Sequence, residues 1–309
     1  MLKNLRTKYL GESALLIVTL FWGATFVIVK ESLGDISSML FIAFRFTIAG
    51  ILFTPFIIKK HIKFTLSAVI SGGLLGLLLF GGFATQTVGL KYTLATKSGF
   101  ITGSSVVMIP IFQTIIEKRL PTKGAILGTA FVLVGILFLS SGGNSIFTFL
   151  ETLGNNFNFG DFLTLICAVF FALYVVYLDI ISKKYDFWLL IFMQIAVTGI
   201  LSFVAAFLFG ISNIEPLKVN FSNNLIFGLL YTSIFATLIT TALQTKYQQL
   251  ISPTKAGIIF SFEPLFAALF AFFVISEKIS TLGLFGGLLI FVGLLTSELF
   301  DVKFGKLFK

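Results

Sequence analysis

The chain has 309 residues, of which 57% are hydrophobic and only 11% are charged, and its formal net charge is +9. Soluble domains carry about one quarter charged residues, so this composition excludes a soluble globular protein and predicts an all-α integral membrane protein. The single cysteine, Cys167, excludes a disulfide within this chain, and the single histidine, His61, excludes a multi-histidine metal site.

Ten apolar runs, separated by short polar connectors, predict ten transmembrane helices, because each run has about the length that crosses a bilayer core. The first run follows three basic residues, as a signal peptide would. It is long, however, and no small-residue cleavage site precedes a hydrophilic region, so we expect a retained span. The predicted spans are residues 13–33, 38–58, 65–86, 97–116, 123–141, 161–181, 187–209, 224–245, 255–276 and 281–299.

The basic residues predict the orientation of these spans. Sixteen Lys and Arg fall on the side of both termini, five fall on the other side, and Arg45 lies inside a span. Cytoplasmic loops carry the excess of Lys and Arg, so both termini are predicted to be cytoplasmic. Topology and contact with anionic lipid headgroups explain the positive charge, and no nucleic-acid partner is needed.

An internal repeat divides the chain into two halves. Gly11-Glu12 recurs as Gly160-Asp161, and the Thr-Lys-x-Gly motif at Lys97 recurs 158 residues later at Lys255. Each half holds five predicted spans, an odd number, so the halves are expected to insert in opposite orientations. Inverted repeats of this kind are typical of secondary transporters, whose substrate sites lie near the midplane. We predict a first five-helix repeat at 1–141, an extracytoplasmic connector at 142–160, a second repeat at 161–300 and a cytoplasmic tail at 301–309.

Polar side chains inside the spans are the candidate substrate contacts. Thr237, Thr241 and Gln244 share one face of span 8, and Ser98, Thr102 and Ser105 share one face of span 4. Interhelical hydrogen bonding is the alternative explanation for each of them. The remaining polar candidates on other spans are Trp22, Thr25, Gln86, Tyr174 and Gln194.

Two charges lie well inside predicted spans, Arg45 in span 2 and Glu263 in span 9. A charge at this depth normally faces protein or a wet cavity. The two are predicted at heights close enough for a structural ion pair, which is one interpretation. The other is that Glu263, beside Pro264, binds a proton or a cationic group of a substrate, because a proline-interrupted helix exposes backbone to a cavity.

Small residues recur four apart in several spans, as at Gly72/Gly76 and Gly124/Gly128. In lipid this pattern permits close helix approach. Spans 5 and 10 carry much of it with few polar groups, so we expect them to be packing or dimerisation helices.

Several short motifs, taken together, resemble the EamA family of the drug/metabolite transporter superfamily. They are Trp22-Gly23, Arg45-Phe46, the segment 98–103 with Pro110, and Phe262-Glu263-Pro264 followed by Glu277-Lys278. The resemblance covers about residues 13–299. It implies a bacterial inner-membrane permease that works by alternating access, often as an exporter of amino acids or related metabolites. It also implies a central cavity built by spans 1, 3, 4, 6, 8 and 9, with spans 5 and 10 at the periphery.

The leading hypothesis is therefore a secondary active transporter for a small-molecule substrate, without a cofactor or bound metal, acting as a monomer or homodimer. Nucleotide sugars and small organic cations are alternative substrates, since related branches carry them. A receptor or scaffold that transports nothing is the alternative from another class. A membrane-embedded enzyme is disfavoured, because the spans hold no His or Cys constellation and no paired carboxylates.

Overall fold

We analysed the protein in a computed structural model. It describes residues 2–60, 62, 64–141, 145, 147–148, 150–151, 157–275 and 280–304. His61, Glu277, Lys278 and part of the predicted 142–160 connector lie outside the described residues.

The described chain is helical, apart from connecting segments and one isolated antiparallel bridge between Ile36 and Val219. The first half of the chain forms α1 (Leu2–Gly23), α2 (Thr25–Ser32), α3 (Ser38–Lys60), α4 (Leu66–Tyr92), α5 (Ala95–Gly103), α6 (Ser105–Glu117) and α7 (Lys123–Ser140). The second half forms α9 (Phe159–Ser182), α10 (Phe187–Ile211), α11 (Asn223–Ser233), η1 (Ile234–Ile239), α12 (Thr240–Tyr247), η2 (Gln248–Leu250), α13 (Pro253–Phe260), α14 (Glu263–Ile275) and α15 (Thr281–Phe304).

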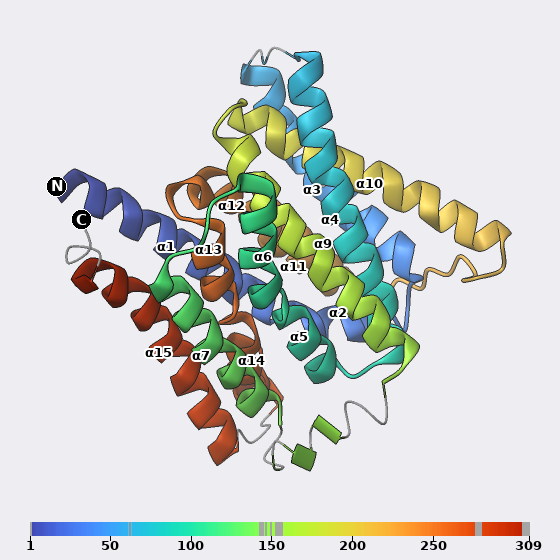
Figure 1. Ribbon diagram of the computed structural model, residues 1–309. Coiled ribbons are helices and arrows are strands. Elements are labelled where there is room, and N and C mark those ends of the chain that lie inside the picture. Colours follow the sequence, from blue (N-terminus) through green and yellow to red (C-terminus); the bar gives the residue numbers. More distant parts are fainter. Residues whose placement is uncertain are drawn as a thin grey trace.

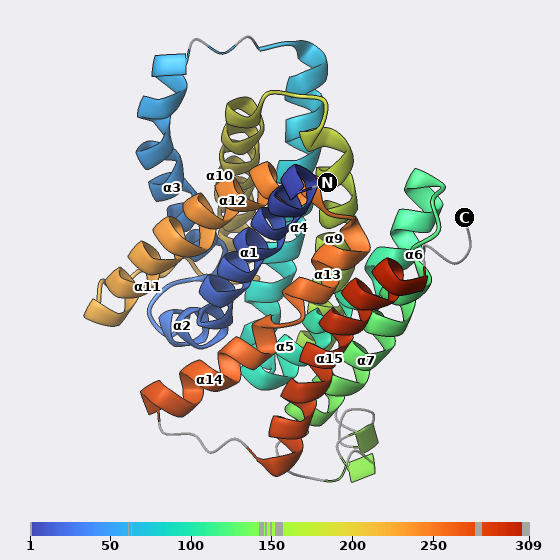
Figure 2. The ribbon, with the colours of Figure 1, turned by 90° about the vertical axis from the view of Figure 1, so that its left-hand side faces the viewer.

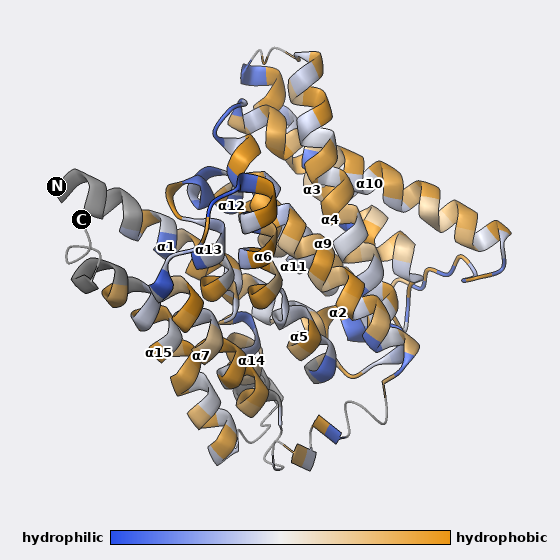
Figure 3. Ribbon diagram, viewed as in Figure 1, coloured by the Kyte–Doolittle hydropathy of each residue, from blue (hydrophilic) through white to orange (hydrophobic). Residues whose placement is uncertain are grey.

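The prediction of an all-α membrane protein with several spans is confirmed. Within the described residues, seven helical segments are long and apolar enough to cross a membrane, and 123–139 and 281–297 are shorter apolar helices. Hydrophobic residues run along the helices, and hydrophilic ones gather at their ends and connections (Figure 3). This distribution suits helices whose outer surfaces contact lipid.

Polar caps set the beginnings of several helices. The side chains of Thr65, Thr122, Ser222 and Ser252 each accept a hydrogen bond from a backbone N–H of the first turn. Asn158 forms a capping box with Asp161 at the start of α9. Such caps satisfy N–H groups that have no partner inside the helix, and they fix where a span begins.

Four of the segments are interrupted rather than continuous. α1 gives way to α2 at Ala24, α5 to α6 at Ser104, and α13 to α14 at Ser261 and Phe262. Between α11 and α12 the chain forms the π-helical turn η1. Pro110 lies inside α6 without ending it, whereas Pro264 is the second residue of α14, a position where proline suits a helix start.

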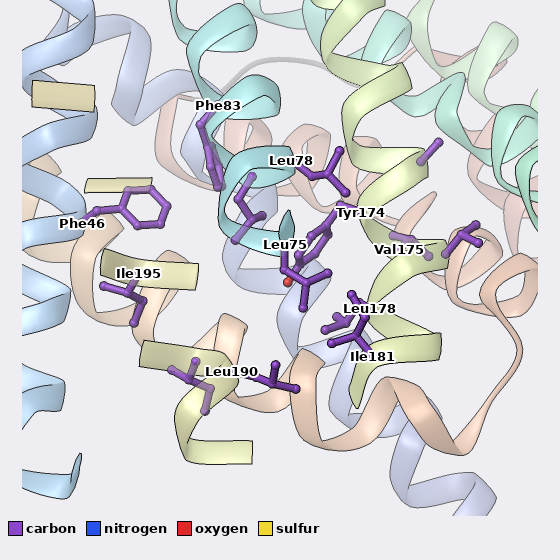
Figure 4. Close-up of a cluster of buried hydrophobic side chains, with 14 of the residues drawn as sticks. Phe46, Leu75, Leu78, Phe83, Tyr174, Val175, Leu178, Ile181, Leu190 and Ile195 are labelled. Atoms are coloured by element: carbon purple, nitrogen blue, oxygen red, sulfur yellow. The ribbon is translucent and has the colours of Figure 1, made fainter. Parts of the chain in front are cut away.

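The main hydrophobic core joins the two halves of the chain. Its labelled members lie on α3, α4, α9 and α10 and include Phe46, Leu75, Tyr174 and Leu190 (Figure 4). Glycines permit this contact: a Cβ at Gly72 would lie 2.7 Å from Met193 Cβ, and one at Gly76 would lie 2.7 Å from Val197 Cβ. The pairing of α4 with α10 therefore depends on two residues without side chains.

α7 and α15 lie side by side at the edge of the bundle (Figures 1 and 2). A Cβ at Gly135 would lie 2.7 Å from the Gly286 carbonyl oxygen, and one at Gly286 would lie 2.5 Å from the Gly135 carbonyl oxygen. Their outward faces carry exposed apolar side chains such as Phe131 and Phe291. The small residues of these two helices thus serve packing within the chain.

Candidate functional site

A cavity lies among helices of both halves. Its lining comes from α1 to α6 in the first half and from α9 and α12 to α14 in the second. None of the described residues of α7, α10 or α15 lines it. Eight of the predicted candidates line this cavity: Trp22, Thr25, Arg45, Gln86, Thr102, Tyr174, Gln244 and Glu263.

The interrupted helices meet at this cavity. Trp22 and Thr25 flank the break between α1 and α2, Gly103 and Ser105 flank that between α5 and α6, and Ser261 and Glu263 belong to the break between α13 and α14. Adding the repeat offset of 158 to 95 and 105, the first residues of α5 and α6, gives 253 and 263, the first residues of α13 and α14. Interrupted helices at corresponding positions of two repeats are the expected setting of a transporter binding site.

Arg45 is 3% exposed and is held by neutral partners. Its Nε donates to Thr237 Oγ1 at 2.6 Å, and its Nη2 donates to the Ala236 carbonyl oxygen at 2.8 Å. The guanidinium carbon lies 4.4 Å from the centre of the Phe83 ring, a cation–π contact. Among the described residues no hydrogen bond to Nη1 is present, and Arg45 lines the cavity.

Glu263 begins α14 and is half-buried in the cavity wall. Within the described part of the chain it forms no ion pair, and no hydrogen bond to its carboxylate is present. The partial positive charge of a helix N-terminus favours a carboxylate in the first turn. The structural ion pair between Arg45 and Glu263, one of the two interpretations of the sequence, is therefore not formed between these described residues.

Aromatic rings from both halves form much of the remaining wall. Trp22 lies 5.3 Å from Phe260, and Phe83 lies 5.3 Å from Phe171, measured between ring centres. Each pair joins one ring from the first half with one from the second. Phe171 fits against α4 because Gly82 is there, since a Cβ at Gly82 would lie 2.4 Å from the Phe171 ring.

A polar strip crosses the cavity beside these rings. Gln86 donates to Thr102 Oγ1 at 3.4 Å, and Ser105 follows at the start of α6. The third member of the predicted span 4 stripe, Ser98, is fully buried and shares a hydrogen bond with Thr164 at 3.3 Å. The stripe therefore divides between the cavity and the helix interface.

Gln194, Thr237 and Thr241 were also candidates, and the structure places all three behind the lining. Gln194 accepts a hydrogen bond from the Tyr174 hydroxyl at 2.6 Å and donates to Thr245 Oγ1 at 3.2 Å. Thr237 supports Arg45, and Thr241 is buried. The π-helical turn at 234–239 changes the angular spacing between residues, so even spacing on an α-helix did not predict which of them reach the cavity.

Some residues that line the cavity have side chains that gave no reason to predict a role in substrate binding. Phe83 and Phe260 are two of 40 phenylalanines, and composition does not distinguish them. The repeat held a signal for Phe83, because Phe83-Ala84-Thr85 recurs as Phe235-Ala236-Thr237. Within the described residues no group of three or more His, Cys, Asp or Glu is arranged to hold a metal ion.

Comparison with known proteins supports a transporter. The sequence model of the EamA-like transporter family matches residues 9–141 and 158–298. An "uncharacterized transporter" of Archaeoglobus fulgidus is 32% identical over 94% of this chain and 86% of its own. The "WAT1-related protein At3g02690, chloroplastic" of Arabidopsis thaliana is 26% identical over 90% of this chain and 67% of its own. A solved crystal structure matches with a TM-score of 0.74 at 17% identity, covering 94% of this chain and 96% of that one, and shows a likeness of fold.

Proposed function

The chain belongs to the EamA-like transporter family, and from this premise we propose that it exports amino acids or related small metabolites by alternating access. The family and the Archaeoglobus fulgidus relative are named as transporters rather than enzymes, and the chain is a multi-pass membrane protein. The proposal adds a substrate class, a direction and a mechanism to that assignment.

The proposed substrate class is supported by one observation: two opposite charges line one cavity and do not pair with each other. Arg45 keeps Nη1 for an anionic group, and the Glu263 carboxylate remains for a cationic one. A zwitterion such as a free amino acid satisfies both, with its carboxylate on Arg45 and its ammonium on Glu263. The rings of Trp22, Phe83 and Phe260 then offer contact to an apolar side chain.

The topology proposed with this function has ten spans in two inverted five-helix repeats, 1–141 and 161–300. Interrupted spans 4 and 9 occupy corresponding positions of the repeats, and both border the cavity. We place the protein in a bacterial inner membrane with both termini cytoplasmic, in keeping with the excess of Lys and Arg on their side of the chain.

A small organic cation is the second candidate substrate. Aromatic rings around a carboxylate are a known way to bind a quaternary ammonium group, and Glu263 lies in a cavity that also holds Trp22 and Phe260. This alternative gives Arg45 a structural role only, since its charge opposes a cation.

Transport into proteoliposomes tests the proposal. The purified protein is reconstituted with internal amino acids, quaternary amines or nucleotide sugars, and counterflow of each labelled compound is measured with and without an ionophore. Counterflow of apolar amino acids supports the first candidate, and counterflow of quaternary amines alone supports the second. A chain that carries none of these compounds under either condition contradicts both.

A further inference from the structure

Two ion pairs join the halves of the chain in the same way. Lys97 Nζ lies 2.6 Å from Asp161 Oδ2, and Lys255 Nζ lies 2.6 Å from Glu12 Oε1. In each pair one residue belongs to the segment 9–141 and the other to 158–298, the two segments that the family model matches. All four side chains are largely buried, with exposed fractions of 13% and 0% in the first pair and 9% and 14% in the second.

The two pairs are copies of one another under the internal repeat. Lys97 and Lys255 share the Thr-Lys-x-Gly motif, and Glu12 and Asp161 share the Gly-acid motif. The lysine of each half therefore contacts the acid of the other half. The ion pair of Lys91 with Glu215 also joins the halves, but the position 152 residues after Lys91 is Leu243, so it has no counterpart.

Each acid lies on a helix that lines the cavity, away from the lining residues of that helix. Glu12 precedes the cavity-lining Trp22 by ten residues, and Asp161 precedes the cavity-lining Phe171 by ten. Ten residues of α-helix span about 15 Å, so each pair lies roughly that far along α1 or α9. Figure 1 shows α1 beginning at the left and α9 beginning at the lower right, so the two helices start at different sides of the bundle.

The backbone next to each acid packs closely against the other half of the chain, which leaves little space between the halves at that position. A Cβ at Gly160, next to Asp161, would lie 2.6 Å from the Gly89 carbonyl oxygen. One at Gly11, next to Glu12, would lie 3.2 Å from the Tyr247 carbonyl oxygen. Asp161 also accepts a hydrogen bond from Thr93 Oγ1 at 2.5 Å and one from the backbone N–H of Asn158 at 2.9 Å.

A buried ion pair can work as a reversible closure. The attraction of its charges holds two helices together where water is excluded. When the helices separate and water enters, hydration of both charges offsets much of the lost attraction, because burial had removed that hydration. The cost of opening is thereby kept moderate. A hydrophobic contact in the same place lacks this compensation, since its exposure to water is unfavourable.

We propose that Lys97–Asp161 and Lys255–Glu12 are the two latches of the transport cycle, each closing one end of the cavity between the halves. This inference rests on the proposed alternating access. Under the proposed topology Lys97–Asp161 closes the outer end and Lys255–Glu12 the cytoplasmic end. Both are formed together here, so the structure represents a state with both latches closed, and opening either one admits water from its own side.

Side-specific cysteine labelling tests this assignment. A reporter cysteine is introduced at the cavity-lining position, Ser105→Cys, in a Cys167→Ala background, and a membrane-impermeant thiol reagent is added to right-side-out or inverted vesicles. The latch variants are Lys97→Gln/Asp161→Asn and Lys255→Gln/Glu12→Gln. Each removes both charges, so no uncompensated charge is left buried.

We expect the first variant to raise the labelling rate at least about fivefold in right-side-out vesicles only, and the second to do so in inverted vesicles only. A fivefold change corresponds to a shift of roughly 1 kcal/mol in the opening equilibrium. Exchanging the charges, as in Lys97→Asp/Asp161→Lys, should return labelling toward the parent rate. Lys183→Gln/Asp179→Asn is the matched control: it removes both charges of an ion pair between Asp179 of α9 and the C-cap residue of the same helix, and it should change neither rate.

Two results overturn the latches: unchanged labelling in both double variants, or acceleration from both sides by each of them. Size-exclusion profiles establish that each variant is folded, and if a neutral pair is not, Lys97→Met or Lys255→Met replaces the Lys→Gln substitution in that pair. There, faster labelling from the side of that latch alone supports the latch, and an unchanged rate contradicts it. Counterflow by the parent protein separates this failure from failure of the proposed function, because absence of counterflow refutes transport whatever the labelling shows.

Discussion

Arg45 on α3 donates its Nε–H to the hydroxyl of Thr237 at 2.6 Å. This contact crosses between the halves of the chain and places a fixed positive charge in the wall of the cavity. The partner lies in the π-helical turn η1, whose Ala236 carbonyl oxygen accepts from Arg45 Nη2 and also from Trp22 Nε1, at 2.8 and 3.4 Å. The charge is held by neutral acceptors, and within the described part of the chain it forms no ion pair with Glu263.

We predict that Thr237→Val lowers the free energy of unfolding by about 1–3 kcal/mol, because the buried guanidinium loses an acceptor that nothing replaces. Thr237→Ser should retain most of the stability. Thermal unfolding of the purified protein in detergent measures the change. Thr54→Val is the control, since the exposed Thr54 hydroxyl bonds only to Gly50 of its own helix. Equal melting temperatures for Thr237→Val and the parent would show that Arg45 does not depend on this contact.

Glu263→Gln should fold normally and lose transport. No described ion pair depends on this carboxylate, so the melting temperature is expected to stay near that of the parent, and Glu263→Asp should keep part of the activity. Counterflow at several pH values measures the effect, with the exposed Glu31→Gln as control. If Glu263→Gln unfolds readily and Arg45→Gln restores it, the two residues pair after all. If Glu263→Gln transports like the parent protein at every pH, Glu263 has no role in transport.

Gly286→Ala should destabilise the contact between α7 and α15. The added Cβ would lie 2.5 Å from the Gly135 carbonyl oxygen and from the Leu139 nitrogen, which are backbone atoms that cannot move aside alone. Overpacking of this kind costs about 1–3 kcal/mol. Gly73→Ala is the matched control, and its expected effect on stability has the opposite sign. Nothing lies within 4 Å of a Cβ there, so the gain of up to ~1 kcal/mol in helix propensity is expected to dominate. The same melting temperature for both variants would contradict the close packing.

Reporter fusions should place both termini in the cytoplasm. We expect a C-terminal green fluorescent protein fusion to fluoresce and an alkaline phosphatase fusion after Asn155 to be active, because of the sixteen-to-five distribution of Lys and Arg. Cell fluorescence and phosphatase activity are the two measurements. The reverse result in both fusions would invert the proposed orientation and exchange the sides of the two latches.

The sequence was sufficient to predict where the helices form and what surrounds them. A run such as 38–58 is too apolar and too long for a soluble connector, and α3 occupies Ser38–Lys60. The sequence repeat also predicted corresponding helix starts: the first residues of α5 and α6 lie 158 positions before those of α13 and α14. Both results follow from local chemistry: hydropathy, helix length and caps act over a few turns of one segment.

The tertiary structure decided which side chains meet. Sequence reasoning left open whether Arg45 pairs with Glu263, and the structure gives Arg45 the partners Thr237 and Ala236 instead. It also shows that the repeated lysines and acids pair across the halves, although both motifs were visible separately. These contacts join residues 64 or more positions apart, and glycines let helices of the two halves approach closely. The distance between two helices does not depend on the properties of either segment alone. The helices could therefore be predicted from the sequence, whereas the contacts between them could be found only in the tertiary structure.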